Sequence, residues 1–297
     1  MTYDSINNSD WVRMRNMQGI IEIQYMQKKN NDCPIQILPG KRYALKETGE
    51  IFNFKENQDK SRMNSYKSLR RTFKNLRYLI NNNFIGARNE LFLTLTYGAD
   101  KGKRLTFDDS KQFYIDFKIF IKEMRRKFGK LEYINVVEPH EDGHIHAHVL
   151  VKFLDIKTVF IDSKLIEKIW GRGFVKVSSL KDVDNIGAYV SAYLSDVELT
   201  EQTAMDVVKS NENPEIKEVN GKKYIKGGRL KYYPAEFNLY RASRGIIKPD
   251  IVEGISEEIK KEAGILGEEP DFRKKYDIEI DEFKNTIIYE HFNTRKL

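Results

Sequence analysis

Four of the five histidines in this chain lie within nine positions, at His140, His144, His146 and His148. If this segment is a β-strand, alternate side chains point to one face, so the imidazoles of His146 and His148 stand side by side. Two imidazoles on a rigid strand provide two nitrogen ligands for a divalent metal ion. The simpler alternative is a solvated strand face that carries histidines and binds no metal.

A third ligand must come from a neighbouring segment. Glu138 ends the preceding predicted strand, and only the loop of residues 139–143 separates it from the histidines, so its carboxylate can reach the same face. His140 in that loop is the alternative third ligand, and His144 with His146 is the alternative ligand pair. Two nitrogens and one carboxylate oxygen leave positions open for phosphate and water, and this mixture suits Mg²⁺ or Mn²⁺.

Tyr189 and Tyr193 are four residues apart, so on a helix they share one face. Core packing is the ordinary explanation for such a pair. The surrounding residues are small, however, and the segment follows the histidine strand by one helix and one strand, which can return it to the same sheet face. A tyrosine phenolate can attack a DNA phosphodiester and form a 5′-phosphotyrosine, while a metal ion stabilises the charge that develops on the phosphate.

The hydrophobic pattern predicts a scaffold that positions these groups. Its strands and helices alternate in the order β-α-β-β-α-β-α, which indicates an α+β fold: a central, mostly antiparallel β-sheet with helices packed on one face. The predicted strands are residues 91–97, 131–138, 144–153 and 173–178, and the predicted helices are 109–128, 162–170 and 185–195.

Segments on either side of this pattern are predicted to be additions to the core. Residues 1–58 read as irregular, residues 61–80 as a basic helix, and residues 252–297 as acidic helices. The chain is therefore expected to have helical N- and C-terminal additions. The predicted domains are an N-terminal extension (1–85), a core (86–200), and a C-terminal extension that is first basic and then acidic (201–297).

The charge distribution suggests where nucleic acid would bind. The chain has 51 Lys and Arg against 44 Asp and Glu, a net charge of +7, and the helix 61–80 contains no acidic residue. A solvated basic face is the alternative explanation for this helix, and the tyrosine-rich stretch 224–241 is a second basic region. The candidate DNA-binding residues are Arg62, Lys67, Arg70, Arg71, Lys74, Arg77, Arg241 and Arg244.

Composition limits the remaining functional classes. The single cysteine, Cys33, excludes an internal disulfide and a cysteine zinc site. No apolar run is long enough to span a bilayer, and no secretory signal is recognised, so we expect a cytoplasmic protein with no membrane partner. No phosphate-binding loop of the helicase type occurs, so we expect no nucleotide cofactor, and any unwinding must come from a host helicase.

Three segments together resemble the motifs of the HUH endonucleases, specifically the rolling-circle replication initiator (Rep) proteins of bacterial plasmids, phages and related mobile elements. They are the hydrophobic, threonine-containing run 92–97, the segment 138–151 with its acid, glycine and His-Ala-His, and the tyrosine segment 189–193. A stretch at 240–249 is similar to an Arg-Ser-Arg-Gly segment of such proteins.

The resemblance implies an HUH/RRM-like palm, with His146, His148 and Glu138 as metal ligands. It also implies Tyr189 as nucleophile, with Tyr193 as a second nucleophile or support. The predicted function is a rolling-circle initiator that nicks and rejoins single-stranded DNA at a replication origin, which we expect to form a hairpin. The alternatives are a transposase or relaxase of the same superfamily, and a non-catalytic nucleic-acid-binding repressor.

Overall fold

The computed structural model divides into two compact units, and each is described by itself. The first comprises Met1–Arg15, Ile21–Lys60 and Ile251–Phe292, and the second comprises Asn16–Ile20, Ser61–Asp250 and Asn293–Leu297. The two ends of the chain thus share a unit, and the division into consecutive domains at residues 85 and 200 stays a prediction. The residues described are 5–29, 34–40, 42–54, 66–98, 109–139, 144–181, 183, 185–195, 197–198, 216–219, 222–225, 238–280 and 283–296.

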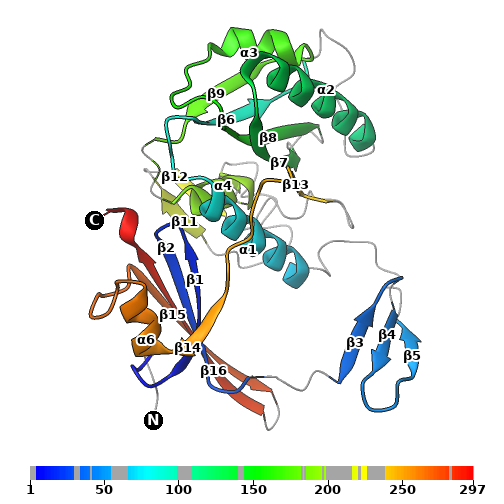
Figure 1. The fold of residues 1–297 in the computed structure, drawn as a ribbon. Helices are drawn as coiled ribbons and strands as arrows, with labels where there is room; N and C mark the ends of the chain where they lie inside the picture. The colour runs from blue at the N-terminus through cyan, green and yellow to red at the C-terminus, as the bar shows by residue number, and fades with distance from the viewer. Residues whose placement is uncertain are drawn as a thin grey trace. The chain divides into compact units, whose positions relative to one another are not determined.

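The second unit is built around a five-stranded antiparallel sheet, which we call the nuclease sheet (Figure 1). Its strands lie in the order β13-β7-β8-β6-β9, so the histidine strand β8 is central. Their bounds are β6 Glu90–Leu95, β7 Leu131–Pro139, β8 Ile145–Phe153, β9 Val175–Ser179 and β13 Tyr240–Ala242. The predicted α+β class and antiparallel sheet are therefore confirmed.

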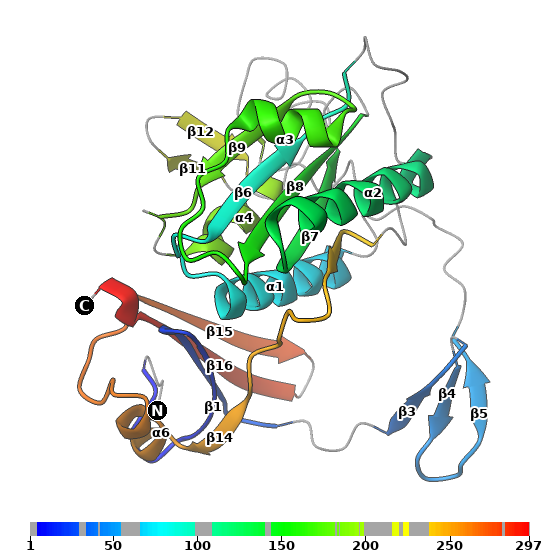
Figure 2. The ribbon, with the colours of Figure 1, turned by 45° about the horizontal axis from the view of Figure 1, so that its top comes forward.

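Helices cover both faces of the nuclease sheet, and the expectation of helices on one face is wrong (Figure 2). One face packs against α2 (Ser110–Phe128) and α3 (Ser163–Trp170), and the other against α1 (Tyr66–Asn83) and α4 (Ile186–Ser195). The reason lies in β8 itself, which is apolar on both sides. Val149 belongs to the first core and Leu150 to the second, and both are fully buried.

Local sequence signals fix the helices of this unit. Asp162 caps α3, since its side chain accepts a hydrogen bond from the Lys164 amide, and Gly171 follows the helix in the left-handed conformation. Gly129 after α2 also has a positive φ of 83°. The helices and strands expected between residues 91 and 195 are all present, with ends that differ by a few residues.

A smaller antiparallel sheet also belongs to the second unit. Its order is β10-β12-β11. The strands are β10 Val197–Glu198, β11 Ile216–Val219 and β12 Lys222–Ile225.

The first unit contains a second five-stranded sheet, which we call the terminal sheet. It joins the two ends of the chain in the order β14-β1-β2-β16-β15. Helix α6 (Ser256–Glu262) covers one face, where Val12, Ile23 and Ile288 form a core with Ile259 of the helix. The strands are β1 Trp11–Met17, β2 Ile20–Met26, β14 Val252–Ile255, β15 Phe272–Ile280 and β16 Phe283–Asn293, and η5 (Thr294–Lys296) follows.

Two expectations for the termini are therefore wrong. Residues 1–58 are not irregular, because they supply β1, β2 and a three-stranded sheet of β3 Ile35–Leu38, β4 Arg42–Leu45 and β5 Ile51–Asn53. Residues 252–297 are mainly strands, and α6 and η5 are their only helices among the described residues. The additions are thus largely β-structure, since alternation in strands such as β1 buries every second residue against α6.

None of the helices within the described ranges combines the length and the apolar character needed to cross a membrane.

Candidate active site

The sheet register brings the three predicted metal ligands together. Glu138 on β7 is the direct cross-strand partner of His146 on β8, and Val136 is the partner of His148. His146 and His148 point to one face because they alternate with Ala147, which is buried in the core beneath α2 and α3. Cross-strand partners share a face, so Glu138 lies on the histidine side of the sheet, as its position before the hairpin predicts.

His148 is held from three sides. Its Nε2 contacts Glu138 Oε2, and its Nδ1 lies 3.3 Å from the hydroxyl of Thr94 on β6. The ring stacks on Phe92, with centroids 5.5 Å apart and planes inclined by 13°. The side chain is only 1% exposed, so its orientation is fixed by packing as well as by hydrogen bonds.

These residues suit a divalent metal in kind, because an imidazole pair and a carboxylate are common ligands. The arrangement present is nevertheless a bonded pair, with the Glu138 carboxylate directly on the ring nitrogen of His148. Within the described ranges no three His, Cys, Asp or Glu side chains are grouped so that they would hold an ion. Metal binding would therefore require the ion to replace the direct contact between Glu138 and His148.

Tyr189 lies on the same sheet face as the histidines. Its ring meets Phe92 edge-on at a centroid distance of 6.5 Å, and Phe92 in turn stacks on His148. Ile186 and Val190 bury the inner side of α4, while the Tyr189 side chain remains 48% exposed. The other predicted nucleophile, Tyr193, belongs to α4, but its side chain lies outside the described residues.

Helix α4 is anchored at its first turn by asparagines. The Asn81 side chain on α1 accepts a 2.7 Å hydrogen bond from the Gly187 amide and donates to Asn185 Oδ1 at 3.0 Å. Asn185 Oδ1 also accepts from the Ala188 amide, so Asn185 caps the helix, as one of the two predicted starts requires. A Cβ on Gly187 would come within 2.6 Å of the Arg77 carbonyl oxygen. Close approach of α1 and α4 therefore requires this glycine.

Sequence reasoning missed three residues of this site. Phe92 and Thr94 belong to the first Rep-like motif, whose role the sequence leaves open, and the structure shows that they contact His148. Asn81 was treated only as part of the segment that ends the preceding helix. No local signal identifies its contact with Gly187, because the two residues are far apart in the chain.

Tyr97, at the end of the same motif, is not equivalent to Tyr189. Its hydroxyl donates to Asp116 at 3.0 Å, and Asp116 also accepts from Arg172 at 3.0 Å. Burial, together with the Asp116 carboxylate, raises the pKa of the Tyr97 hydroxyl far above its ordinary value. Tyr97 therefore stays protonated as a hydrogen-bond donor and is unsuited to act as a phenolate.

The Arg-Ser-Arg-Gly segment completes the edge of the nuclease sheet. β13 pairs with β7, and Ser243 exchanges hydrogen bonds with the backbone of Tyr133. The Gly245 amide donates to Glu132, and a Cβ at this glycine would lie 2.5 Å from that carboxylate. The segment thus has a clear structural role.

The candidate DNA-binding residues have different environments. Arg71 and Arg244 are exposed, and the Arg241 guanidinium lies 3.3 Å from the ring centroid of Tyr114. Lys74 and Arg77 are half-buried over Tyr78. Arg62, and the side chains of Lys67 and Arg70, lie outside the described residues.

Comparison with known proteins supports the Rep resemblance. Residues 90–198 match the family model of the replication-associated protein ORF2. This segment, about a third of the chain, runs from β6 to β10 and contains all three predicted ligands and both tyrosines. The resemblance to Rep-type proteins is therefore confirmed for this segment, and it supports a role in replication initiation in general terms. No curated protein matches the sequence.

Among solved structures, the chain is similar to the N-terminal nuclease domain of the minute virus of mice non-structural protein 1. The match has 13% identity, covers 75% of each chain and has a TM-score of 0.18. That viral domain coordinates Zn²⁺ in its active-site pocket and recognises DNA at the origin of replication. A TM-score this low carries no argument about the present chain.

Proposed function

We propose that this protein is a rolling-circle replication initiator that nicks and rejoins single-stranded origin DNA, with Tyr189 as its first nucleophile. One observation carries the proposal: a continuous series of contacts links Tyr189 through Phe92 to His148 and Glu138 on one sheet face. A half-exposed tyrosine beside a fixed imidazole–carboxylate pair suits attack on a phosphodiester that approaches from solvent.

The reaction balances as a transesterification. The Tyr189 hydroxyl loses its proton and attacks the phosphorus, so that a bond forms between the phenolic oxygen and the phosphate. The bond between phosphorus and the 3′ oxygen breaks, and that oxygen leaves as a 3′-hydroxyl after it gains a proton. Because the phosphotyrosine is itself a phosphodiester, a free 3′-hydroxyl can reverse the step without a nucleotide cofactor.

His146, His148 and Glu138 would hold the divalent ion, Mg²⁺ or Mn²⁺. When bound, such an ion stabilises negative charge on a non-bridging phosphate oxygen. The other residues act on the protein side: Thr94 and Phe92 fix the His148 ring, and Asn81 and Gly187 set the position of α4. Fixed neighbours of this kind are what a ligand or nucleophile needs to meet its target without reorganisation.

The remaining parts of the proposal concern partners. Tyr193 would serve as second nucleophile, which permits two successive strand transfers. The exposed Arg71, Arg241 and Arg244 would contact the phosphate backbone of an origin hairpin. A host helicase would unwind the duplex, since the sequence contains no nucleotide-binding loop of the helicase type.

The direct test is adduct formation. The protein is incubated with Mn²⁺ and labelled single strands derived from its origin, and products that survive SDS are resolved on a gel. A shifted covalent band is expected from the natural sequence and from the control variant Tyr43→Phe, whose ring lies on β4 in the first unit. Tyr189→Phe should abolish it.

Each other outcome has a definite meaning. Binding without any adduct favours the non-catalytic repressor and overturns the enzymatic proposal. An adduct that survives in Tyr189→Phe but disappears in Tyr193→Phe reverses the order of the two tyrosines. Identical adducts in both variants place the nucleophile elsewhere and overturn the role of α4.

A further inference from the structure

The terminal sheet has one face that α6 does not cover. Val12 and Met14 point into the core beneath α6, so the alternating residues Trp11 and Arg13 point to the opposite face. Trp11 is 50% exposed, and Arg13 pairs across the strands with Glu253. This opposite face therefore presents an aromatic ring and a cation on β1.

The far edge of the sheet repeats this pairing of an aromatic ring with a cation. On β16, Ile288 and Phe292 enter the core, so their neighbours Ile287 and Tyr289 face away from α6. The cross-strand partners of these two residues on β15 are Tyr276 and Lys274. The side chain of Tyr276 is 44% exposed and meets Tyr289 edge-on, and the Lys274 ammonium lies 4.9 Å from the centre of the Tyr276 ring. Phe272, next on this face, is also exposed.

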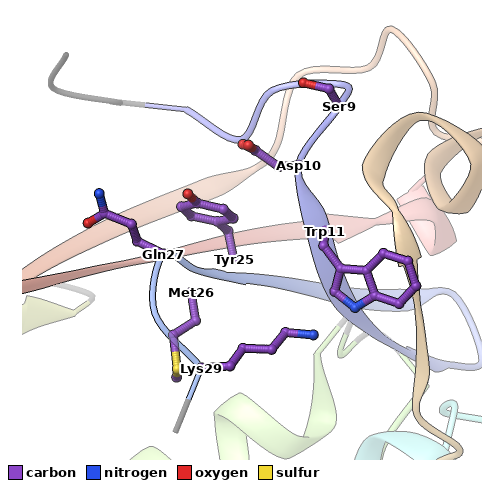
Figure 3. Close-up of a pocket in the computed structure, with 7 residues that line it drawn as sticks. All are labelled: Ser9, Asp10, Trp11, Tyr25, Met26, Gln27 and Lys29. Carbon is purple, nitrogen blue, oxygen red and sulfur yellow. The ribbon is translucent and has the colours of Figure 1, made fainter. Parts of the chain in front are cut away.

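The open face ends at a pocket of about 410 Å³ near the start of β1 and the end of β2 (Figure 3). Trp11 forms one wall, and the Lys29 ammonium lies 5.2 Å from the centre of its ring. Ser9, Asp10 and Gln27 add polar groups to the lining. An aromatic surface beside hydrogen-bonding groups can take up a flat, polar ring such as a nucleobase.

We propose that this face, defined by Trp11, Arg13, Lys274, Tyr276 and the pocket, is a platform for single-stranded DNA. Exposed aromatic rings bind unpaired bases by stacking, and cations between them contact the phosphates. Three strand spacings separate β1 from β15, so Trp11 and Tyr276 are about 14 Å apart across the sheet. A single strand laid across the sheet therefore meets an aromatic ring at each side.

The charges of the platform favour an anionic partner. Arg13 and Lys29 share one carboxylate, Glu253, at 2.7 and 3.5 Å. The Arg13 hydrogen bond lowers the pKa of Glu253 below its ordinary value, so that carboxylate remains ionised and holds both cations at the surface. With Lys274, the exposed charges of the platform are three cations against one anion. A duplex, whose bases are already stacked, could use the cations but not the rings.

Tryptophan fluorescence tests this proposal directly. The chain has two tryptophans, and Trp170 is buried with its indole N–H bonded to the Thr96 carbonyl, so an added strand should quench Trp11 selectively. The full-length Tyr189→Phe variant, which should not cleave, is titrated with a short oligothymidylate. We expect quenching that disappears in a variant that also carries Trp11→Phe. Absence of quenching, or equal quenching by a duplex of the same length, would overturn the proposal.

Affinity measured by fluorescence anisotropy provides the second arm. Trp11→Ala and Tyr276→Ala should each weaken oligothymidylate binding by about tenfold. The matched control is Phe160→Ala, which removes an aromatic ring that is 96% exposed in the second unit and should leave affinity unchanged. An equal loss in the control, or no loss in the two platform variants, contradicts the platform.

The platform and the proposed function fail separately. Loss of the covalent adduct with quenching retained refutes only the role of Tyr189. An adduct formed normally by a protein whose Trp11 does not respond to single strands refutes only the platform.

Discussion

The nuclease sheet and the terminal sheet have the same number of strands but opposite exposure. Helices cover both faces of the nuclease sheet, and His148 and Glu138 are buried within it. The terminal sheet is covered by α6 on one face and presents Trp11 and Tyr276 on the other. Enclosure fixes the groups that would perform chemistry, whereas an open face suits a surface that holds a flexible strand.

The two sheets also hold their buried carboxylates differently. Glu138 contacts a histidine, which can exchange that contact for a metal ion. Glu290 in the terminal sheet binds Lys260 at 2.8 Å and Arg273 at 3.0 Å. Two permanent cations leave no ligand role for Glu290, so we assign it to stability alone.

The largest expected effect comes from a metal ligand. His146→Ala should lower the rate of Mn²⁺-dependent cleavage by about 100-fold or more, because it removes one of the nitrogen ligands. His146 is only partly buried, so the fold should survive, and the melting temperature checks this.

His144→Ala is the matched control on the same strand face and should cleave nearly normally. Loss of cleavage in His144→Ala would support the alternative pair His144 and His146, and normal cleavage by His146→Ala would contradict both pairs.

Glu290→Gln should affect the terminal sheet and spare the chemistry. Removal of one partner from a buried ion pair costs about 3 kcal/mol, so the free energy of unfolding of this unit should fall by that amount. Denaturant unfolding followed by Trp11 fluorescence measures the change. The control Glu269→Gln removes a carboxylate that is 93% exposed beside the same Arg273 and should change little. A large loss of adduct in folded Glu290→Gln protein would show that the two sheets do not work independently.

A third comparison replaces a glycine in each unit. A Cβ on Gly187 would lie 2.6 Å from a backbone oxygen, whereas one on Gly254 would meet a flexible Ile259 side chain at 3.4 Å. Gly187→Ala should therefore cost about 1–3 kcal/mol of stability and slow adduct formation by moving α4 away from α1. Gly254→Ala should do neither. Equal melting temperatures and equal adduct yields in the two variants would contradict the tight α1–α4 contact.

The smallest expected effect concerns the surface of the second unit. Arg244→Ala should weaken binding of all DNA sequences alike and reduce the dependence of log affinity on log salt by about one unit, as loss of one phosphate contact predicts. Binding titrations at several salt concentrations measure this slope. A change in sequence preference with an unchanged slope would instead indicate contact with a base.

Sequence reasoning succeeds where the pattern is local. The strands and helices between residues 91 and 195 follow from their hydrophobic periodicity. The sharing of a face by Glu138, His146 and His148 follows from strand alternation across a short hairpin. Both signals need only neighbouring residues.

Prediction fails where distant segments meet. The terminal sheet pairs β2 with β16, more than two hundred residues later, and its open face mixes rings, cations and acids, which masks the alternation. Asn81 acts on Gly187 only because α1 and α4 come together on the nuclease sheet. The ring of Phe92 lies between Tyr189 and His148 through packing that no spacing in the sequence reveals.

The most direct test of the central claim is to identify the residue that becomes linked to DNA. The adduct formed with an origin strand is trapped, digested with protease and nuclease, and sequenced by mass spectrometry. We predict a nucleotide on Tyr189 in the first turn of α4. A nucleotide on a tyrosine outside α4, or a peptide from α4 that is never modified, would contradict the proposed site.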